Sequence, residues 1–359
     1  FNTLYQLVAH EQLQPGEMSH AHRLLLIPDI FHAWLSGNLV TELTNASTTQ
    51  CWNPTRGAWA TDLLDLVGLP ASIFPPVVKA GTDLGTVLPE MQAELGTPRV
   101  IAPATHDTGS AIAGVPVSFQ SDWGYISSGT WSLVGVELPQ PLISTAALAA
   151  NCTNEGGIFG TTRFLKNVMG LWLLQECQRR WARDGYTVDY DILLAETDAI
   201  TPFAALIDPD DPRFLAPDDM PATINAYLIE HRQSALTTPP AFARCIMESL
   251  VLRYAQVFAE IAHLTGKRLT GIHIVGGGSQ NARMNQWLAD ALDIPVLAGP
   301  GEATALGNAL MQLVGLGELR TLADVRHLAQ VTPTTAFLPR PTHQASWREA
   351  GGRFAALTG

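Results

Sequence analysis

Apolar residues recur along this chain in two alternating patterns, and the patterns predict helices and strands in turn. The longest stripe has apolar residues three or four positions apart, and it predicts a helix that begins at Pro240 and ends at Gly266. Short continuous apolar runs predict strands at 99–104, around 164, at 272–275 and at 294–297. Strands that alternate with helices are typical of the α/β class, in which helices pack on a sheet.

Capping and helix-breaking residues predict the ends of several shorter elements. Asn2 and Thr3 are expected to cap a first helix, and a helix that starts at Asp29 is expected to end at Gly37. Small polar residues inside an apolar stretch predict two strands joined by a turn at 125–136. Further helices are predicted at 167–183, from about 281 and from 303.

The length of 359 residues is enough for two domains of ordinary size. The pattern changes after Val115 and Pro116, so we expect a boundary there, with one domain at 1–115 and the other at 116–359. Hydrophobic residues make up 47% of the chain and charged residues 15%, so the chain can bury a large core. No apolar run in the sequence approaches the roughly 20 residues that a membrane-spanning helix requires.

Charge and cysteine spacing argue against several classes of protein. Asp and Glu outnumber Lys and Arg by 33 to 21, and this net charge of −12 argues against nucleic acid or an anionic membrane as the main partner. The cysteines are too far apart in sequence to suggest a zinc site or a disulfide framework, which favours a cytoplasmic protein. They are Cys51, Cys152, Cys177 and Cys245.

Asp107 is the first candidate for chemistry because it follows a predicted strand. Open α/β sheets bind ligands at the carboxyl ends of their strands, and a carboxylate there can accept a proton from a substrate hydroxyl. His106 and Thr108 flank it with further hydrogen-bonding groups. A helix cap is the alternative interpretation, in which Asp107 accepts from the N–H groups two and three residues further on.

Two turns of small residues are candidates for binding phosphates. Gly276, Gly277 and Gly278 lie between a predicted strand and a helix, where backbone N–H groups can approach a nucleotide without a Cβ in the way. Their spacing matches neither a Walker A loop nor G-x-G-x-x-G. The segment 127–130 would offer hydroxyls and N–H groups at a hairpin tip. The alternative for each segment is an ordinary turn without a ligand.

Asn167 and Gln175 are further polar candidates, on or beside the helix predicted at 167–183. Asn167 could cap that helix, and Gln175 could face solvent or bond to the backbone. The acidic stretch at 208–212 is expected to be a solvated turn.

Taken together, these segments resemble the FGGY family of carbohydrate kinases. The similarity runs in order across essentially the whole chain, and the stretch at 165–175 is its most specific part. The segments that carry it are 105–108 (THDT), 125–132 (YISSGTWS), 154–157 (NEGG), 165–175 (LKNVMGLWLLQ) and 276–281 (GGGSQN).

The resemblance implies a two-domain fold of the actin, Hsp70 and hexokinase type, with ribonuclease H-like cores and ATP in the cleft between them. It implies that Asp107 is the catalytic base. It also implies roles for the other polar candidates. Sugar contacts are implied for His106, Thr108 and Asn167, and ATP contacts for Thr130, Gln175 and Gly277, with the backbone of Gly129 and Gly278 expected to hold the nucleotide as well.

One departure from the family pattern lies at the start of the chain. The family's chain begins with a strand and an Asp-x-Gly phosphate loop whose Asp helps to hold Mg²⁺, and this sequence shows no counterpart. We therefore expect an incomplete first domain, explained by a fragment, an incomplete gene or a split enzyme. We also expect little or no activity from residues 1–359 alone.

The implied reaction is transfer of the γ-phosphoryl group of ATP, with Mg²⁺, to the 1-hydroxyl of L-rhamnulose in L-rhamnose catabolism. The resemblance implies a cytoplasmic enzyme, expected to be a monomer. L-Fuculose or another deoxy-ketose is the alternative substrate. A sugar- or nucleotide-binding module without activity and an acid–base hydrolase are the rival functions, although a hydrolase would need a second placed carboxylate or a nucleophile.

Overall fold

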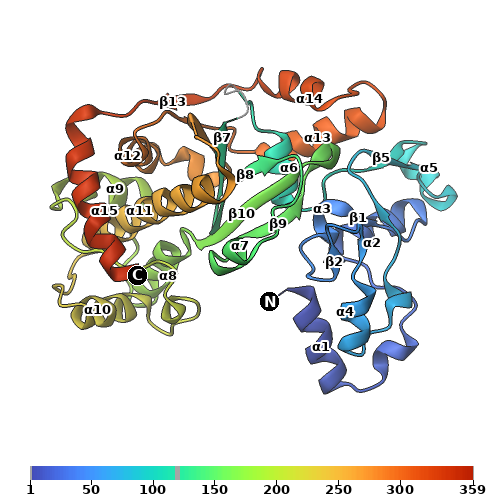
Figure 1. The fold of residues 1–359 in the computed structure, drawn as a ribbon, viewed down its shortest axis with the longest axis horizontal. Helices are drawn as coiled ribbons and strands as arrows, with labels where there is room; N and C mark the ends of the chain where they lie inside the picture. Colours follow the sequence, from blue (N-terminus) through green and yellow to red (C-terminus); the bar gives the residue numbers. More distant parts are fainter. Residues whose placement is uncertain (1, 118–121, 359) are drawn as a thin grey trace. The chain divides into compact units, whose positions relative to one another are not determined.

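In the computed structural model, which describes residues 2–117 and 122–358, the chain divides into two units (Figure 1). Unit 1 comprises Phe1–Ser118, Val136–Leu165 and Glu302–Pro333. Unit 2 comprises Phe119–Gly135, Lys166–Gly301 and Thr334–Gly359. Each unit is therefore built from segments that lie apart in the sequence. Both units combine helices with strands, so the predicted α/β class is confirmed.

Unit 1 is made mostly of short elements. Its helices are α1 (Thr3–Leu13), α2 (Ile27–Ser36), α3 (Leu43–Ala46), α4 (Thr61–Leu66), α5 (Gln92–Leu95), α6 (Asp107–Ala113), α7 (Thr145–Ala149), α13 (Ala303–Gly315) and α14 (Leu322–Ala329). Its strands are β1 (Thr41–Glu42), β2 (Trp52–Asn53), β3 (Ala58–Trp59), β4 (Val77–Val78), β5 (Thr82–Thr86), β6 (Arg99–Ala102) and β9 (Thr153–Gly156). β1 pairs with β4 in parallel, whereas the pairs β2–β3 and β5–β6 are antiparallel. β9 pairs antiparallel with β10 (Thr162–Met169).

Helix α6, which begins at Asp107, packs closely along α13 (Figure 1). Glycines permit this approach. A Cβ at Gly114 would lie 2.6 Å from the carbonyl oxygen of Ala303, and a Cβ at Gly307 would collide with the carbonyl group of Ser110. The helices also share an apolar cluster formed by Ala104, Ala113, Ile158, Leu310, Met311, Val325 and Ala329. The position of α6 in unit 1 is therefore fixed by α13.

Unit 2 contains a mixed sheet with the strand order β13–β12–β11–β7–β8–β10. The strands are β7 (Trp123–Ser128), β11 (Gly271–Val275), β12 (Val296–Ala298) and β13 (Thr335–Phe337), together with β8 (Trp131–Leu138) and β10, which have residues in both units. β7, β11 and β12 are parallel neighbours, whereas β7 and β8 form an antiparallel hairpin. The helices are α8 (Trp172–Arg183), α9 (Tyr190–Glu196), α10 (Met220–Glu230), α11 (Pro239–Thr265), α12 (Ala282–Leu292) and α15 (Gln344–Thr358).

The long helix predicted at 240–266 is confirmed as α11, and a glycine with a φ of 67° ends it. The buried residues of this helix include the predicted apolar face and also Arg244, Glu248 and Arg253. Arg244 donates to Glu248 at 2.7 Å, and Arg253 donates to Asp210 at 2.7 Å. Buried charges require such partners, because an isolated charge in a core is strongly destabilising.

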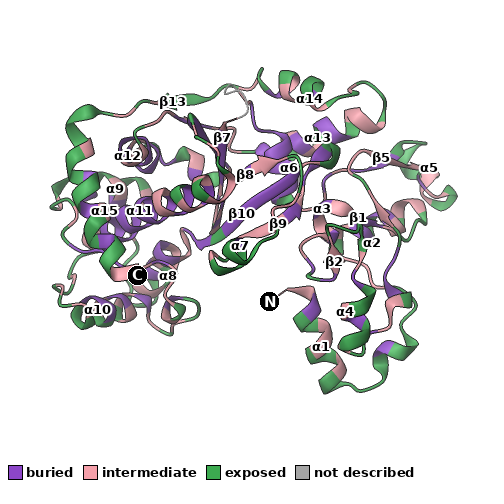
Figure 2. Cartoon of the chain, in the orientation of Figure 1, coloured by how far each residue is buried: buried purple, intermediate pink, exposed green. Residues whose placement is uncertain are grey.

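The helix predicted at 167–183 starts later than expected, so that prediction is wrong at its N-terminal end. α8 begins at Trp172, and residues 162–169 form β10 instead. Asn167 therefore lies in a strand and caps no helix. Asn167 is exposed, while the rest of β10 is buried. Figure 2 shows this strand mostly in purple, the colour of buried residues.

Two smaller predictions also need correction. Asn2 precedes α1, but its side chain makes no cap bond and donates to the carbonyl oxygen of Thr48 at 3.1 Å. The acidic stretch at 208–212 contains the predicted turn, at 209–210, but most of it is partly or fully buried rather than solvated. Asp210 accepts from the Arg253 side chain and also from the N–H of Met169, at 3.3 Å.

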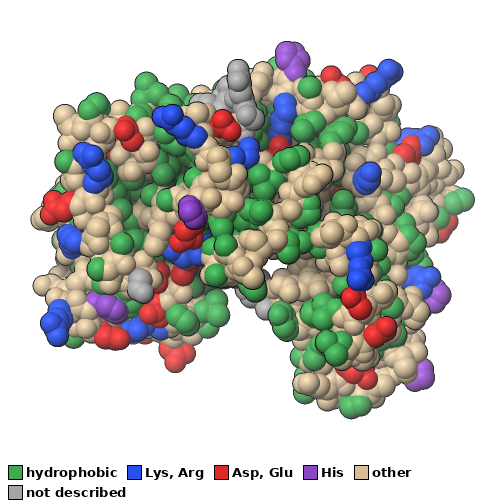
Figure 3. Space-filling view, in the orientation of Figure 1, with side chains coloured by type: hydrophobic (Ala, Val, Ile, Leu, Met, Phe, Trp, Pro, Cys, Tyr) green, Lys and Arg blue, Asp and Glu red, His purple; other side chains and the backbone are tan. Residues whose placement is uncertain are grey.

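The surface carries charges of both signs. On the face drawn in Figure 3, Lys and Arg side chains lie apart from one another, among acidic and apolar ones. Within 2–117 and 122–358, no helix combines the length and apolarity needed to cross a membrane. Cys51, Cys177 and Cys245 are buried and Cys152 is half-buried, and none of these four cysteines forms a disulfide.

Candidate active site

Asp107 lies where β6 leads into α6 in unit 1. β6 ends at Ala102, a short segment follows, and Asp107 is the first helical residue. Its side chain is 80% exposed. Oδ1 accepts a hydrogen bond from the N–H of the adjacent Thr108 at 2.6 Å. This is not the cap geometry considered from the sequence, which reaches two and three residues further on. The N-cap position belongs to His106.

Glu42 fixes the segment that precedes Asp107, and sequence reasoning missed it. Its buried carboxylate accepts the N–H of Thr105 at 2.9 Å and the N–H of Thr44 at 3.0 Å, and it also accepts both threonine hydroxyls. The Thr44 hydroxyl oxygen in turn accepts the N–H of His106 at 3.1 Å. Burial raises the pKa of Glu42, and these hydrogen bonds oppose the rise. The backbone beside Asp107 is therefore tied to a buried acid.

A second buried carboxylate, Asp29, lies next to Glu42. Asp29 Oδ1 accepts the N–H of Glu42 at 3.2 Å. Burial is the main cause that raises the pKa of Asp29 to about 6, and the charge of Glu42 adds to it. His32 Nδ1 on α2 lies 4.0 Å from the same oxygen, and burial lowers the pKa of this histidine. The residues that hold the backbone beside Asp107 thus include two buried acids, and burial raises the pKa of both.

His106 lies between a buried arginine and Asp107. Arg163 on β10 is fully buried, and its Nη2 lies 3.0 Å from His106 Nδ1 and 3.0 Å from Glu155 Oε2. Arg163 Nε donates to the carbonyl oxygen of Gly156 at 3.0 Å. The other ring nitrogen, His106 Nε2, lies 3.5 Å from Asp107 Oδ1. Burial first, and the Arg163 charge second, lower the pKa of His106.

The structure brings His106, Asp107 and Thr108 together at the start of α6. Thr108 is buried, and its hydroxyl lies 3.4 Å from Asp107 Oδ1. Thr304 on α13 donates its hydroxyl to the carbonyl oxygen of Asp107 at 3.2 Å. Of the three predicted sugar-side residues at 106–108, Asp107 is the one with an exposed side chain.

Gly129 and Thr130 form the turn between β7 and β8 in unit 2, where the sequence predicted a hairpin. The carbonyl oxygens of this turn accept N–H groups from the start of α8, Gly129 from Leu171 at 3.3 Å and Thr130 from Trp172 at 3.1 Å. Gly170 makes this contact possible, because a Cβ there would lie 2.8 Å from the Thr130 oxygen. The turn is thus held by backbone contacts with the helix that carries Gln175.

Gln175 and Asn167 occupy different environments. Gln175 lies on α8 and accepts a hydrogen bond from the Thr130 hydroxyl at 3.4 Å, so it joins the hairpin turn. Asn167 lies on β10 between the buried residues Lys166 and Val168. An exposed amide in an otherwise buried strand is free to contact a ligand.

The glycine turn follows β11 and lies against the end of β7, because these two strands are parallel neighbours. Gly276 has a φ of 82°, and a Cβ there would lie 2.8 Å from the carbonyl oxygen of Ser128. A Cβ at Gly278 would overlap the Ser128 side chain. At the exposed Gly277, an added Cβ would have no described atom within 4 Å. The fold requires glycine at 276 and 278, whereas position 277 opens onto solvent.

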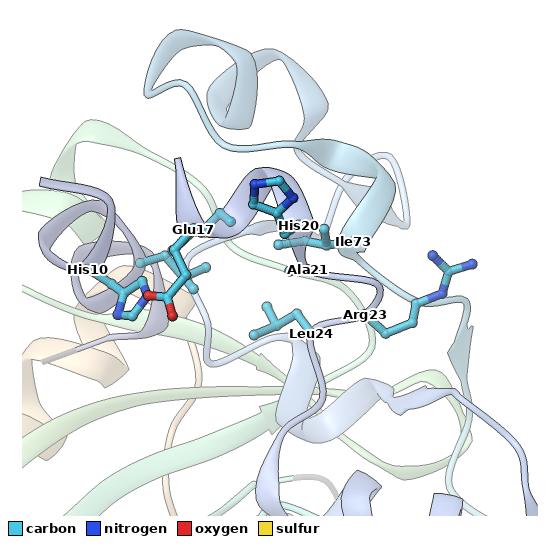
Figure 4. Close-up of a pocket in the computed structure, with 9 residues that line it drawn as sticks. His10, Glu17, His20, Ala21, Arg23, Leu24 and Ile73 are labelled. Atoms are coloured by element: carbon cyan, nitrogen blue, oxygen red, sulfur yellow. The ribbon is translucent and has the colours of Figure 1, made fainter. Parts of the chain in front are cut away.

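A surface cavity of about 510 Å³ lies near α1 in unit 1 (Figure 4). It is lined by side chains that include His10, Glu17, His20 and Arg23, and His10 Nε2 lies 2.7 Å from Glu17 Oε2. None of the site residues predicted from the sequence lines it. We assign this cavity no part in the chemistry.

Comparison with known families and structures agrees with the sequence resemblance. Models of the FGGY family of carbohydrate kinases match residues 1–114 with the family's N-terminal domain and 124–316 with its C-terminal domain. The crystal structure of gluconate kinase from Lactobacillus acidophilus matches with a TM-score of 0.79 at 16% sequence identity. That match covers 99% of this chain and 71% of the other. The chain belongs to the FGGY family of carbohydrate kinases and has its two-domain, mixed α/β fold.

Curated proteins with similar sequences show which carbohydrate kinases of this family the chain resembles. A protein named Rhamnulokinase from Pectobacterium atrosepticum is 44% identical over 362 residues, which cover 100% of this chain and 70% of the relative. Another Rhamnulokinase, from Enterococcus faecalis, is 42% identical over 346 residues, which cover 95% of this chain and 69% of the relative. The chain thus spans about 70% of the length of these relatives.

Proposed function

We propose that this protein transfers the γ-phosphoryl group of ATP to the 1-hydroxyl group of L-rhamnulose. Rhamnulokinases that are 44% and 42% identical over nearly the whole chain support both the reaction and the substrate. One structural observation carries the proposal. Asp107 presents an exposed carboxylate at the first residue of α6, after a backbone segment that buried Glu42 fixes. The individual roles given below are proposed together with this function.

Asp107 acts as the general base. Its carboxylate accepts the proton of the sugar 1-hydroxyl, whose oxygen forms a bond to the γ-phosphorus. The bond from that phosphorus to the bridging β–γ oxygen breaks, and ADP leaves. A base on a fixed backbone suits this reaction, because phosphoryl transfer depends mainly on the positions of the reacting groups.

His106, Thr108 and Asn167 contact the sugar. His106 lies beside the Asp107 carboxylate, so its ring can contact the sugar, and Asn167 is exposed on β10 and can donate to sugar oxygens. The Thr108 hydroxyl, in contrast, is buried against Asp107. The N–H of Thr108 already serves the reaction by holding Asp107 Oδ1.

Gly129, Thr130, Gln175, Gly277 and Gly278 bind the nucleotide. Their turns follow β7 and β11, which are parallel neighbours, and the carboxyl ends of such strands are where α/β sheets bind ligands. The open space at Gly277 admits a nucleotide group close to the backbone. Gly278 contributes by packing, which keeps the two turns together.

Mg²⁺ is proposed to arrive with ATP, because this ion is commonly bound by substrate phosphates and water. When bound, it neutralises charge on the β- and γ-phosphates. Among the described residues, no group of three or more His, Cys, Asp or Glu side chains is placed to hold a metal ion. We therefore assign Mg²⁺ no ligand from this chain.

We also propose the division of the chain at residue 115. The family models support it, because they match 1–114 and 124–316 as separate domains. Cytoplasmic location and a monomeric state are also proposals, and cysteines that form no disulfide support the first of them.

A coupled assay of ADP release tests the function. The assay, like the kinetic tests below, uses the chain with the family's opening strand and phosphate loop joined to residue 1. We expect this protein to release ADP only when a ketose is present, with kcat/KM for L-rhamnulose about tenfold or more above that for L-fuculose. Phosphorus–proton NMR of the product should place the phosphate on carbon 1. A higher kcat/KM for L-fuculose would replace the proposed substrate. ADP release that is independent of any ketose would contradict the proposed reaction.

A further inference from the structure

Arg163 is a fully buried charge on β10 that reaches the imidazole next to the proposed base. Its Nε donates to the carbonyl oxygen of Gly156, and its Nη2 donates to His106 Nδ1, both at 3.0 Å. The same Nη2 forms an ion pair with Glu155 Oε2 at 3.0 Å. These contacts hold the guanidinium in one orientation, with an N–H directed at the imidazole.

The contact with Arg163 decides which ring nitrogen of His106 carries the proton. A guanidinium has only hydrogen-bond donors and stays protonated in proteins, so Nδ1 must accept with its lone pair. The proton of the neutral imidazole is then on Nε2. Glu155 Oε2 also lies 3.4 Å from Nδ1, but its charge is paired with Arg163 at a shorter distance. The lowered pKa of His106 agrees with a neutral ring.

The proton on Nε2 is the one that faces Asp107. Nε2 lies 3.5 Å from Asp107 Oδ1, so its N–H can orient the carboxylate that we propose as the base. A neutral N–H does this without placing a full positive charge beside the carboxylate. An imidazolium in the same place would weaken the base, because a nearby positive charge favours the ionised form of a carboxylate.

We infer that Arg163 is a positioning residue, which fixes His106 as the neutral Nε2–H tautomer and thereby orients the Asp107 carboxylate. The inference rests on the proposed function for the role of Asp107, whereas the state of His106 is a property of the fold. The charged groups that face His106 are Asp107 from α6, Glu155 from β9 and Arg163 from β10. Without Arg163, the imidazole would lie between two carboxylates, which favours the imidazolium.

Nitrogen-15 NMR spectra of the imidazole groups in the full chain test this state directly, with the His106 signals assigned by their loss in His106→Gln. We expect wild-type His106 at pH 7 to have an unprotonated Nδ1 and a protonated Nε2. In Arg163→Met we expect Nδ1 to become protonated and the pKa of His106 to rise, because Glu155 then attracts the proton. A protonated Nδ1 in the wild type, or an unchanged Nδ1 in Arg163→Met, overturns the inference.

Two further variants keep the test decisive. Arg163→Lys retains the positive charge, and we expect it to keep Nδ1 unprotonated. If Arg163→Met is too unstable to purify, Arg163→Met/Glu155→Gln removes both buried charges at once. We expect the proton of His106 in that double variant to be shared between the two ring nitrogens, and a ring that stays purely in the Nε2–H form overturns the inference.

Kinetics connect the imidazole to the base. We expect kcat of Arg163→Met to fall about tenfold or more, because the carboxylate loses its orienting donor and faces a positive charge. We expect KM for ATP to change less than about twofold, because the proposed nucleotide contacts belong to unit 2. Arg163→Lys should recover most of kcat. An unchanged kcat in Arg163→Met overturns the positioning role.

Arg244→Met is the matched control. Arg244 donates to buried Glu248 at 2.7 Å and to the carbonyl oxygen of Thr197 at 2.8 Å, so this buried pair in unit 2 resembles that of Arg163 but lacks an imidazole. We expect a similar fall in melting temperature and unchanged His106 signals. Altered His106 signals in the control would overturn the inference. If the wild-type chain shows the expected spectrum, but the protein with the family's opening segment joined to it does not turn over L-rhamnulose, the proposed function is refuted and the state of His106 stands.

Discussion

The candidate residues of the two units are held in place by different physical means. In unit 1, charges buried beneath the surface fix the surroundings of Asp107: Glu42 binds the preceding backbone, and Arg163 binds the imidazole of His106. Such a segment depends on the protonation and pairing of acids and bases that cannot reach water.

In unit 2, close contacts of small residues fix the nucleotide-side turns. Gly276 and Gly278 lie against Ser128, and Gly170 lies against the carbonyl oxygen of Thr130. These contacts involve backbone atoms, a hydroxyl-bearing side chain and missing Cβ atoms, with no charged side chain in them. The difference teaches that the surroundings of Asp107 in unit 1 should respond to changes in charge and pH. The nucleotide-side turns of unit 2 should respond to changes in side-chain volume.

Asp107→Asn changes the proposed base in unit 1, and we expect it to have the largest effect of these variants. Asn has nearly the same shape but cannot take up the proton, so we expect kcat to fall by about 10²- to 10⁴-fold. KM for the ketose and for ATP should stay within several-fold, because the surrounding contacts remain. Steady-state kinetics at saturating concentrations of both substrates measure the effect. An unchanged kcat would leave Asp107 with a structural role only.

Asp29→Asn tests whether a buried acid of unit 1 makes the stability of the protein depend on pH. The pKa of Asp29 in the fold, about 6, lies above its ordinary value of 3.8, so the folded state binds the proton more tightly than the unfolded state. Wild-type stability is therefore lost as pH rises from 3.8 to about 6, and Asn removes this loss. We expect the free energy of unfolding of the variant, relative to wild type, to increase by about 3 kcal/mol across that range.

Denaturant unfolding of both proteins at several pH values from 3.8 to above 6 measures this difference. Gly278→Ala serves as the control from the nucleotide-side turns of unit 2. The free energy of unfolding that this substitution removes should be the same at every pH. A difference between Asp29→Asn and wild type that does not vary with pH would show that Asp29 is not a source of the pH dependence.

Gly278→Ala and Gly277→Ala compare neighbouring glycines that differ in their surroundings. The new methyl group at 278 overlaps Ser128, so we expect a loss of about 1–3 kcal/mol in stability. The methyl group at 277 meets open space, so stability should change by less than about 0.5 kcal/mol while KM for ATP rises several-fold. Gly277→Val should raise KM for ATP further. Equal losses of stability at both positions would contradict this distinction.

Glu42→Gln tests the buried acid that holds the backbone beside Asp107, and we expect a smaller effect than that of Asp107→Asn. The amide keeps one acceptor oxygen but turns a donor group toward the N–H groups of Thr44 and Thr105. We expect kcat to fall about tenfold as the Asp107 segment loosens, with KM for ATP unchanged. Kinetics at one pH measure both values. A rise in KM for ATP equal to the fall in kcat would show that the two sides are not held independently.

Local sequence patterns predicted the elements that depend on local forces. The long apolar stripe gave the limits of α11 to within one or two residues, and the small residues at 127–130 predicted the β7–β8 hairpin. The start of α8 was missed because it depends on a distant contact. Gly170 and the residues after it pack on the hairpin turn, while 162–165 pair with β9, so the helix cannot extend back to Asn167.

The candidate site could be predicted only where its residues follow one another in the sequence. Asp107 was found because it comes soon after a predicted strand. Glu42 and Arg163 were not found, because they lie 63 residues from Thr105 and 57 residues from His106 respectively, and no local pattern signals such contacts. Arg163 adjoins Phe164, around which the sequence predicts a strand, and a charge inside a predicted strand is the signal that could have drawn attention to it.

The three consecutive glycines show a different limit of sequence reasoning. Nothing in the sequence distinguishes Gly276, Gly277 and Gly278 from one another. Their difference comes from Ser128, which belongs to the neighbouring strand and meets two of them. Which glycine serves the fold and which leaves space for a ligand therefore becomes visible only in the structure.

The open surroundings of Gly277 also make this position suitable for a fluorescent reporter of nucleotide binding. A cysteine introduced there would have an exposed thiol, since its Cβ has no described atom within 4 Å. The native thiols would compete poorly for a label, because reaction requires the thiolate. Burial raises the pKa of Cys51 to about 11 and also raises the pKa of Cys177 and Cys245. With Cys152 replaced by serine, the protein offers a single attachment point for a dye, beside the proposed nucleotide contacts.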